Sequence, residues 1–346
     1  MIKVCLVVSD YLKNNRIFDE SGIHRDDIFD RFCVLKKKFK SLGFDLQTQD
    51  INTINESDIV LYASNMPQDL PERNKIDKSY IILSESEFIR PDNYDLENHK
   101  YFKRIFTWKD DIVDGEKYIK LNYAHKIPNS ININNNKDKL LVLISANKKP
   151  PFSKNKDLYS ERVSAIRWFE KNAANDFDLY GIGWDRFRFY GPRLIRVLNR
   201  APFIGKLIYK IFKLGYPSYK GMVDNKKEVM EKYKFSICYE NAKDIPGYIT
   251  EKIFDSFFAG CVPVYFGADN IDKHIPKECF IDMRSFDNYE DLYHFLKNMP
   301  NERYEEYLNA IFNYIQSRSI YPFSSEGFSD TIIEIIKKDY NKNDNF

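Results

Sequence analysis

Long apolar runs are absent from this 346-residue sequence. No stretch approaches the roughly 20 consecutive apolar residues that span a bilayer as a helix. The apolar run that opens the chain is short and is not followed by the cleavage site of a signal peptide. These features predict a cytoplasmic protein, whose contact with a membrane would be peripheral, at the inner face of the cytoplasmic membrane.

The sequence also has few cysteines, no strong excess of charge of either sign, and none of the common nucleotide-binding motifs. The 5 cysteines are scattered without a CxxC pair, which is typical of reduced thiols and not of a disulfide framework or a zinc site. The 53 basic residues nearly balance the 51 acidic ones, so a surface that binds nucleic acid is not expected. Neither G-x-G-x-x-G nor a Walker lysine motif occurs.

The apolar segments that are present alternate between strand and helix patterns. In the first half, strands are predicted at 2–8, 57–64, 79–86 and 104–108, with an amphipathic helix over 27–44 that Gly43 closes. A polar, asparagine-rich linker at 129–139 follows. In the second half, strands are predicted at 140–147, 177–183, 234–241 and 261–267, with helices at 159–173 and 250–260 and a largely helical end from Tyr289.

This alternation predicts an α/β protein with two Rossmann-like, doubly wound domains, residues 1–135 and 136–346, which face a central cleft. Open α/β sheets bind ligands at the carboxyl ends of their strands.

The most informative block is KFSICYENAKDIPGYITEKIFDSFFAGCVPVYFG, residues 234–267. A buried strand ends in Glu240 and Asn241, and a helix begins near Thr250. Free backbone N–H groups and the helix dipole favour an anion at such a helix start. Lys252 adds a positive charge there, and Glu251 offers acceptors for a ribose diol. A solvated first helical turn is the alternative interpretation of the same spacing.

The block resembles the donor-binding motif of glycosyltransferase family 10, the α-1,3/4-fucosyltransferases. The resemblance lies in YEN, YITEK and CVPVYFG, at residues 239–241, 248–252 and 261–267. It implies a GT-B fold with the nucleotide held by the C-terminal domain. It also implies that Asn241, Tyr248, Glu251 and Lys252 contact the ribose and diphosphate of GDP-fucose.

Further segments resemble the same family. The resemblance implies that the helix 159–173 presents an arginine to the diphosphate, with Arg162 as the corresponding residue and Arg167 as its rival. A planar guanidinium suits this task, since it pairs with two phosphate oxygens and keeps its charge. Ser145 and Asn147 are expected to line the guanine pocket, and Tyr219 precedes the key strand as part of a glycine turn.

The N-terminal domain is expected to supply the catalytic base. The segment ILSESEFIRPDNY resembles the family segment in which a glutamate faces the acceptor, so Glu85 is the first candidate and Glu87 the second. If this segment is extended, both side chains lie on one face. Neighbouring carboxylates would then raise one pKa toward neutrality, as a general base requires.

The resemblance implies an inverting transfer of L-fucose from GDP-fucose to a glycan hydroxyl, with O3 of GlcNAc in a lactosamine-type acceptor favoured. The acceptor would be an oligosaccharide or a lipid-linked glycan such as that of lipopolysaccharide. No DxD-type dyad stands out, so no metal is expected to be required, although Mn²⁺ or Mg²⁺ would stimulate release of GDP. Two alternatives stay open: a different nucleotide sugar, or a non-catalytic glycan- or membrane-binding module.

One segment falls outside these motifs. Residues 186–213, the basic insert, contain eight Arg and Lys residues and no Asp or Glu. Apolar residues interleave with the charges at helical spacing, and Pro192 and Pro202 divide the segment into two predicted short helices. Such an element suits an anionic membrane surface, a flap over the acceptor, or a solvated cover.

Overall fold

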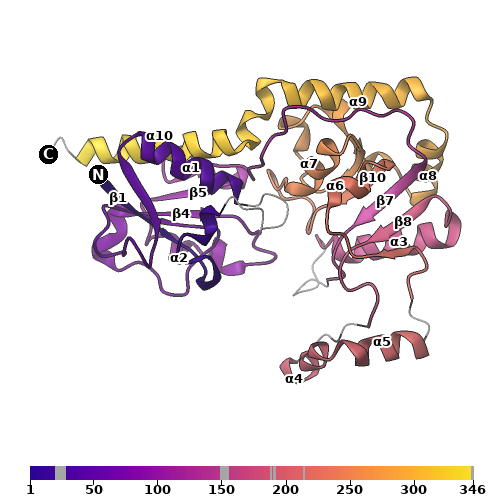
Figure 1. The fold of residues 1–346 in the computed structure, drawn as a ribbon, viewed down its shortest axis with the longest axis horizontal. Coiled ribbons are helices and arrows are strands. Elements are labelled where there is room, and N and C mark those ends of the chain that lie inside the picture. The colour runs from indigo at the N-terminus through magenta and orange to yellow at the C-terminus, as the bar shows by residue number, and fades with distance from the viewer. Residues whose placement is uncertain (20–28, 149–155, 188, 190–191, 213–214, 344–346) are drawn as a thin grey trace.

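The computed structural model describes residues 1–19, 29–148, 156–187, 189, 192–212 and 215–343. The chain forms two sheets of parallel strands with helices on their faces (Figure 1). The predicted α/β class is therefore confirmed. In each half, the β-α alternation places apolar strands in the centre, and such strands are buried on both faces.

The N-terminal sheet has the strand order β2-β1-β3-β4-β5-β6. Its strands are β1 (Ile2–Val7), β2 (Phe44–Thr48), β3 (Ile59–Tyr62), β4 (Ser79–Leu83), β5 (Arg104–Thr107) and β6 (Tyr118–Lys120). Its helices are α1 (Asp30–Ser41) and the short α2 (Leu96–His99). Helix α1 buries Phe32, Leu35 and Phe39, and the positive φ of Gly43 (83°) turns the chain into β2.

The C-terminal sheet has the order β12-β11-β10-β7-β8-β9. Its strands are β7 (Lys139–Ile144), β8 (Phe177–Tyr180), β9 (Tyr219–Gly221), β10 (Tyr233–Tyr239), β11 (Val262–Phe266) and β12 (Ile281–Asp282). Its helices are α3 (Tyr159–Asn172), α4 (Arg193–Arg196), α5 (Pro202–Ile211), α6 (Lys226–Met230), α7 (Glu251–Phe258), α8 (Tyr289–Lys297) and α9 (Asn301–Gln316). The order reverses between β7 and β10, which makes this point the topological switch.

The last helix, α10 (Ser325–Asn343), joins the N-terminal domain and not the C-terminal one. It runs on from α9 and lies beside α1 (Figure 1). Its residues Phe328, Ile332 and Ile336 belong to the core of the N-terminal sheet. Residues 325–343 lie in the range predicted for the C-terminal domain, so the chain crosses between the two units twice.

Asp110 of the N-terminal domain makes direct contacts with the C-terminal domain. Its carboxylate accepts hydrogen bonds from Asn270 and His274, both at 2.7 Å, and pairs with Lys120 of its own domain. Burial would raise the pKa of Asp110, but the bonds from His274, Lys120 and Asn270 outweigh it and hold the pKa well below its usual range.

Gly247 brings the two domains closer still. Its φ of 80° is a backbone conformation that L side chains rarely adopt, and an added Cβ would lie 2.3 Å from the carbonyl oxygen of Trp108. Tyr248, the next residue, packs its ring 4.7 Å from that of Trp108. The loop that carries the YITEK motif is therefore fixed against the N-terminal domain.

Candidate active site

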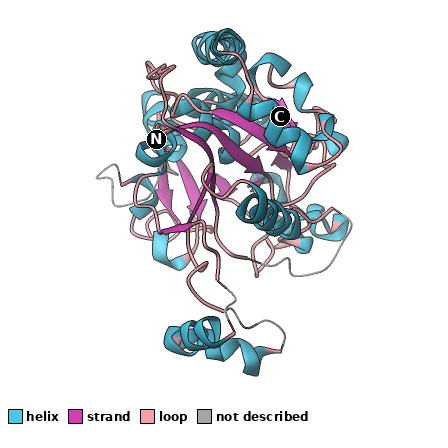
Figure 2. Cartoon of the chain, turned by 90° about the vertical axis from the view of Figure 1, so that its right-hand side faces the viewer, coloured by secondary structure: helices cyan, strands magenta, loops and turns pink. Residues whose placement is uncertain are grey.

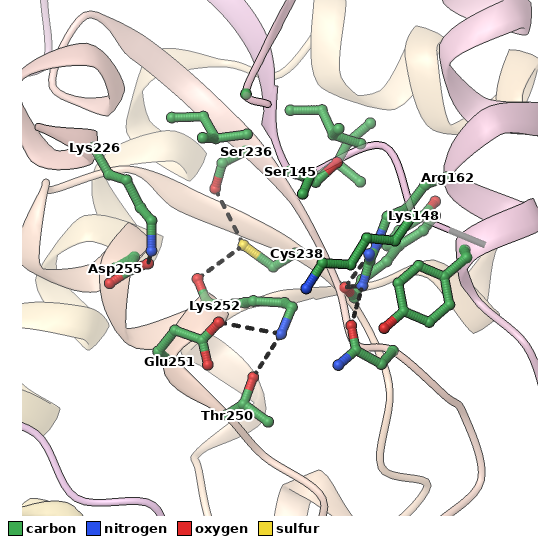
Figure 3. A pocket seen from close by; sticks show the side chains of 18 of the residues that line it. Ser145, Lys148, Arg162, Lys226, Ser236, Cys238, Thr250, Glu251, Lys252 and Asp255 are labelled. Atoms are coloured by element: carbon green, nitrogen blue, oxygen red, sulfur yellow. Dashed lines mark hydrogen bonds and ion pairs between the residues drawn. The ribbon is translucent and has the colours of Figure 1, made fainter. Parts of the chain in front are cut away.

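A cavity of about 370 Å³ opens at the switch point of the C-terminal sheet, where β7 and β10 end (Figure 3). Such a point is where open α/β sheets bind ligands, because the flanking loops diverge there. Glu85 and Tyr123 of the N-terminal domain line the cavity together with residues of the C-terminal domain. The cavity therefore lies between the two domains, as the sequence predicted for the cleft.

A fully buried glutamate organises the start of α7. Glu240, at the end of β10, accepts hydrogen bonds from the backbone N–H of Thr250 at 2.8 Å and from its hydroxyl at 2.6 Å. It also pairs with Lys252 at 3.1 Å. Because the Thr250 hydroxyl is engaged with Glu240, Thr250 makes no side-chain cap to α7. The helix start is thus left to an external anion.

Lys252 is the cation that this arrangement positions. Its ammonium also donates to the hydroxyl of Thr250 at 2.9 Å and contacts Glu251 at 3.3 Å (Figure 3). Burial would lower the pKa of Lys252, but Glu240 and Glu251 raise it above its usual range. Lys252 therefore stays charged, and its side chain keeps 22% of its surface exposed, toward the cavity.

Glu251 is more exposed than Glu240, with 47% of its side chain accessible to solvent. Burial would raise the pKa of Glu251, but Lys252 and Lys226 lower it well below its usual range. It is therefore an ionised acceptor in the cavity, of the kind that binds sugar hydroxyls.

Arg162 lies inside the protein, with 5% of its surface exposed. Its Nη2 donates to the carbonyl oxygens of Tyr239 and Glu240 and to Oδ1 of Asn241, at 2.7, 2.6 and 3.1 Å. Its Nε also donates to Tyr239. Within the described ranges, Nη1 makes no hydrogen bond, and Arg162 lines the cavity. The residue thus ties α3 to the end of β10 and retains donor capacity for an anion.

The rival Arg167 is placed differently. It pairs with Glu170 at 2.7 Å, donates to the backbone of Gly215 and stacks its guanidinium over the ring of Tyr216. It does not line the cavity. Of the two predicted arginines, only Arg162 is in position for a ligand there.

Tyr248 and Asn241 form a hydrogen-bonded pair at the cavity wall. Nδ2 of Asn241 donates to the hydroxyl of Tyr248 at 3.2 Å, so the Tyr248 proton remains available to another acceptor. Burial raises the pKa of Tyr248 well above its usual value, and the phenol stays protonated. This geometry suits donation to an anionic oxygen.

The structure separates Ser145 from Asn147, the two residues predicted for the guanine pocket, and places Tyr219 of the predicted glycine turn with Asn147. Ser145 lines the cavity, and its buried hydroxyl has no hydrogen-bond partner in the part of the chain that is described. Asn147 and Tyr219 do not line it. They bind the backbone of the neighbouring loop instead, Asn147 at Gly183 (3.0 Å) and Tyr219 at Gly181 (2.9 Å). Their positions set the loop that forms the cavity wall.

Gly181 is required in that wall. Its φ is 125°, and an added Cβ would lie 2.0 Å from the carbonyl oxygen of Ser145. A larger residue would push the β7 and β8 loops apart.

Three further lining residues were not identified from the sequence. Lys148 and Lys226 add positive charge, and Lys226 pairs with Asp255 at 2.9 Å. Tyr123 adds an aromatic ring from the N-terminal domain. The pattern S-A-N-K after an apolar strand could have pointed to Lys148, but nothing in the local sequence marks the other two.

Glu87 lies in a turn that begins just after Glu85. Residues 87–89 form this turn, so the segment is not extended and the expectation of a shared face is wrong. Glu87 pairs with Lys109 at 2.6 Å and does not line the cavity, whereas Glu85 does. Burial raises the pKa of Glu85, Lys252 opposes this shift, and Glu251 adds to it. The second carboxylate near Glu85 is therefore Glu251, and not Glu87.

Comparisons with known proteins find a sequence likeness in the segment that carries the YITEK motif. Residues 208–325 match the family model of the glycosyltransferase family 10 (fucosyltransferase) C-term. An alpha-(1,3)-fucosyltransferase of Helicobacter pylori is 31% identical over 90 residues, which make up 26% of this chain. The aligned part spans only 18% of the length of that relative.

Two solved structures extend the likeness to both domains. An alpha1,3-fucosyltransferase crystallised with GDP-fucose has a TM-score of 0.50 and 14% sequence identity, covering 89% of this chain and 81% of its own. An alpha-glucosyltransferase in complex with UDP-glucose and DNA has a TM-score of 0.54 and 11% identity, covering 97% and 99%. At these identities the likeness concerns the fold, which is GT-B as predicted. Residues 208–325 therefore resemble the glycosyltransferase family 10 (fucosyltransferase) C-term, within a chain that has the two-domain GT-B fold of these solved structures.

Proposed function

We propose that this protein transfers L-fucose from GDP-fucose to a hydroxyl of a glycan. The observation that carries the proposal is the convergence of Arg162, Asn241, Tyr248 and Lys252 on one cavity at the switch point. The likeness to the fucosyltransferase family model supports a fucosyl donor. The matched segment, residues 208–325, contains Asn241, Tyr248 and Lys252. The fold alone does not choose the donor, since the alpha-glucosyltransferase shares it.

The diphosphate of the donor would lie between the start of α7 and Arg162. Lys252, Nη1 of Arg162 and the hydroxyl of Tyr248 can donate to its oxygens, while Glu251 accepts from the ribose. During transfer, negative charge develops on the departing diphosphate. Preorganised donors in a partly closed site stabilise such charge more than water does. Lys148 and Lys226 strengthen the local positive field.

Glu85 is proposed as the general base. It reaches the cavity from the N-terminal domain, opposite the donor-side residues. It would take the proton from the acceptor hydroxyl while that oxygen attacks the anomeric carbon of fucose and the bond to GDP breaks. A single displacement inverts the configuration, so a β-linked donor gives an α-fucoside.

No metal is required in this proposal, because the protein's own cations face the diphosphate. Mn²⁺ or Mg²⁺ would act by helping GDP to leave. We expect turnover to persist in EDTA, and its complete loss would contradict this part of the proposal.

The acceptor is proposed to be an oligosaccharide or lipid-linked glycan, with O3 of GlcNAc in a lactosamine unit as the favoured position. The test is an activity screen of GDP-fucose, GDP-mannose and UDP-glucose against a panel of acceptors, with the linkage read by NMR. Turnover with GDP-fucose alone is expected. Turnover only with another donor would favour a different glycosyltransferase, and donor binding without turnover on any acceptor would favour a binding module.

Glu85→Gln tests the base. The variant should bind GDP as the wild type does and turn over about 10²–10⁴-fold more slowly. Since burial raises the pKa of Glu85, wild-type turnover should rise with pH through that raised value. The variant should lose this rise. Glu87→Gln is the matched control, because it removes the neighbouring carboxylate outside the cavity, and near-normal turnover is expected. If Glu87→Gln and not Glu85→Gln abolishes turnover, the assignment is wrong.

A further inference from the structure

Helices α4 and α5 of the basic insert form an arm that projects from the C-terminal domain, whereas residues 188, 190, 191 and 213 of the insert lie outside the described residues. Both views show α4 and α5 standing away from the two sheets (Figures 1 and 2). The predicted pair of short helices is confirmed, with a further single-turn helix at Val197–Arg200 between them. No described helix of the chain is long and apolar enough to cross a membrane.

The outer side of the arm exposes large apolar side chains. On α5, Phe203, Leu207 and Ile211 are 70%, 56% and 63% exposed, and their spacing of four residues aligns them in one stripe. Leu194 on α4 is 86% exposed. Exposed apolar residues that occur singly are ordinary, but an aligned stripe such as that on α5, on a projecting element, indicates a contact surface.

Positive charge borders this stripe. Lys206 and Lys210 each precede a residue of the stripe by one position and therefore lie along its edge. Lys206 pairs with Asp185 at 3.4 Å. Arg186, the first residue of the basic insert, also pairs with Asp185, at 2.7 Å. Among the described residues, no ion pair involves Arg193, Arg196, Arg200 or Lys210. The charge of the arm is thus largely uncompensated.

The inner side of the arm is fixed. The hydroxyl of Tyr209 donates to the carbonyl oxygen of Trp184 at 2.5 Å and accepts from the backbone of Tyr216 at 2.8 Å. The N–H of Phe187 donates to Gly205 at 3.0 Å, and an added Cβ at Gly205 would lie 2.4 Å from the Phe187 carbonyl oxygen. These contacts hold the rest of α5 to the body, so the orientation of the exposed stripe is determined by the fold.

We infer that the outer side of α4 and α5 binds an anionic phospholipid surface. A helix that lies in a membrane interface buries an apolar stripe between flanking Lys and Arg side chains, which pair with acidic headgroups. The arm has both features. A second copy of the chain is a poor occupant, because a two-fold contact would oppose two surfaces of like charge. This inference goes beyond the proposed fucosyl transfer and does not depend on it.

The test is co-sedimentation of the full chain with vesicles of phosphatidylcholine alone or mixed with phosphatidylglycerol. We expect binding only to the mixed vesicles. Salt should release the protein, since screening acts over about 8 Å at 0.15 M ionic strength. Replacement of Arg193, Arg196, Arg200 and Lys210 by Gln should lower the partition coefficient at least about tenfold. Leu207→Gln with Ile211→Gln should also lower it, because these exposed side chains would no longer enter the interface.

The matched control removes four exposed lysines elsewhere on the surface, Lys40, Lys277, Lys337 and Lys338, by the same change to Gln. It alters the net charge equally and should bind like the wild type. Absence of wild-type binding, or equal binding by the arm and control variants, overturns the inference. Unchanged vesicle binding of the arm variant with a raised KM for a soluble acceptor would identify the arm as an acceptor flap instead. Melting temperatures of all variants show that they fold.

Discussion

Glu240→Gln is the most direct test of how the site is built. Glu240 is fully buried and accepts three hydrogen bonds, two from Thr250 and one from Lys252. Glutamine keeps one acceptor oxygen, which can still serve the N–H of Thr250. Its amide group replaces the other oxygen and presents donors to the Lys252 ammonium, which can only donate. The Thr250 hydroxyl would have to reverse from donor to acceptor, so both hydrogen bonds to the charged carboxylate are lost.

The expected loss follows from these contacts. A hydrogen bond to a charged group contributes about 1.5–3 kcal/mol, and two are lost. The lower end of that range applies, because Lys252 is partly exposed and retains Glu251 as a partner. A loss of about 3 kcal/mol in the free energy of unfolding corresponds to a fall of roughly 6–12 °C in Tm for a domain of this size. GDP binding should weaken as well, since the Lys252 ammonium is no longer held.

Thermal unfolding and calorimetric titration with GDP measure both effects. Glu251→Gln is the matched control, because it makes the same chemical change beside Lys252 at an exposed carboxylate. It should leave Tm nearly unchanged while still weakening the binding of GDP-fucose through the lost ribose contact. If Glu240→Gln melts with the wild type and binds GDP equally well, Glu240 does not organise the site.

Two further predictions concern the donor site and the domain contact. Lys252→Ala should weaken GDP binding roughly 10- to 150-fold, because one charged hydrogen bond is lost, and calorimetry measures this change. Unchanged GDP affinity in both Lys252→Ala and Arg162→Ala would contradict the proposed donor site. Asp110 has a lowered pKa, so the stability that it provides is present above its ordinary pKa of 3.8 and is lost as the pH falls below that value. The Asp110→Asn variant should therefore be less stable than the wild type near neutral pH and should lose less stability on acidification. If the acid unfolding curves of the variant and the wild type are parallel, the contacts of Asp110 do not contribute this pH-dependent stability.

The sequence by itself determined the central strands and the donor motif. Strands such as 234–241 and 261–267 are continuous apolar runs because they are buried on both faces of a parallel sheet, and that pattern is readable without a structure. The four strands that the patterns did not identify, β2, β6, β9 and β12, are the edges of the two sheets. They are short and half-buried, so their composition carries little signal.

The tertiary structure alone decided which residues meet at the cavity. Arg162 and Glu85 come from segments far from the motif, and only the crossovers of the two sheets bring them to it. The turn at residues 87–89 directs Glu87 to Lys109, whereas Glu85 lines the cavity, and the sequence could not distinguish the two glutamates.

Tertiary packing also assigned roles that composition hides. Glu240 looked like the polar end of a strand, yet it is buried because β11 and the start of α7 close over it. Helix α10 has an ordinary amphipathic pattern, which does not specify which of two cores receives its apolar face. A local sequence pattern determines whether a segment forms a helix or a strand and which of its faces is buried. The element against which that face packs depends on contacts between residues that are distant in sequence. The packing of α10 against α1 is an example.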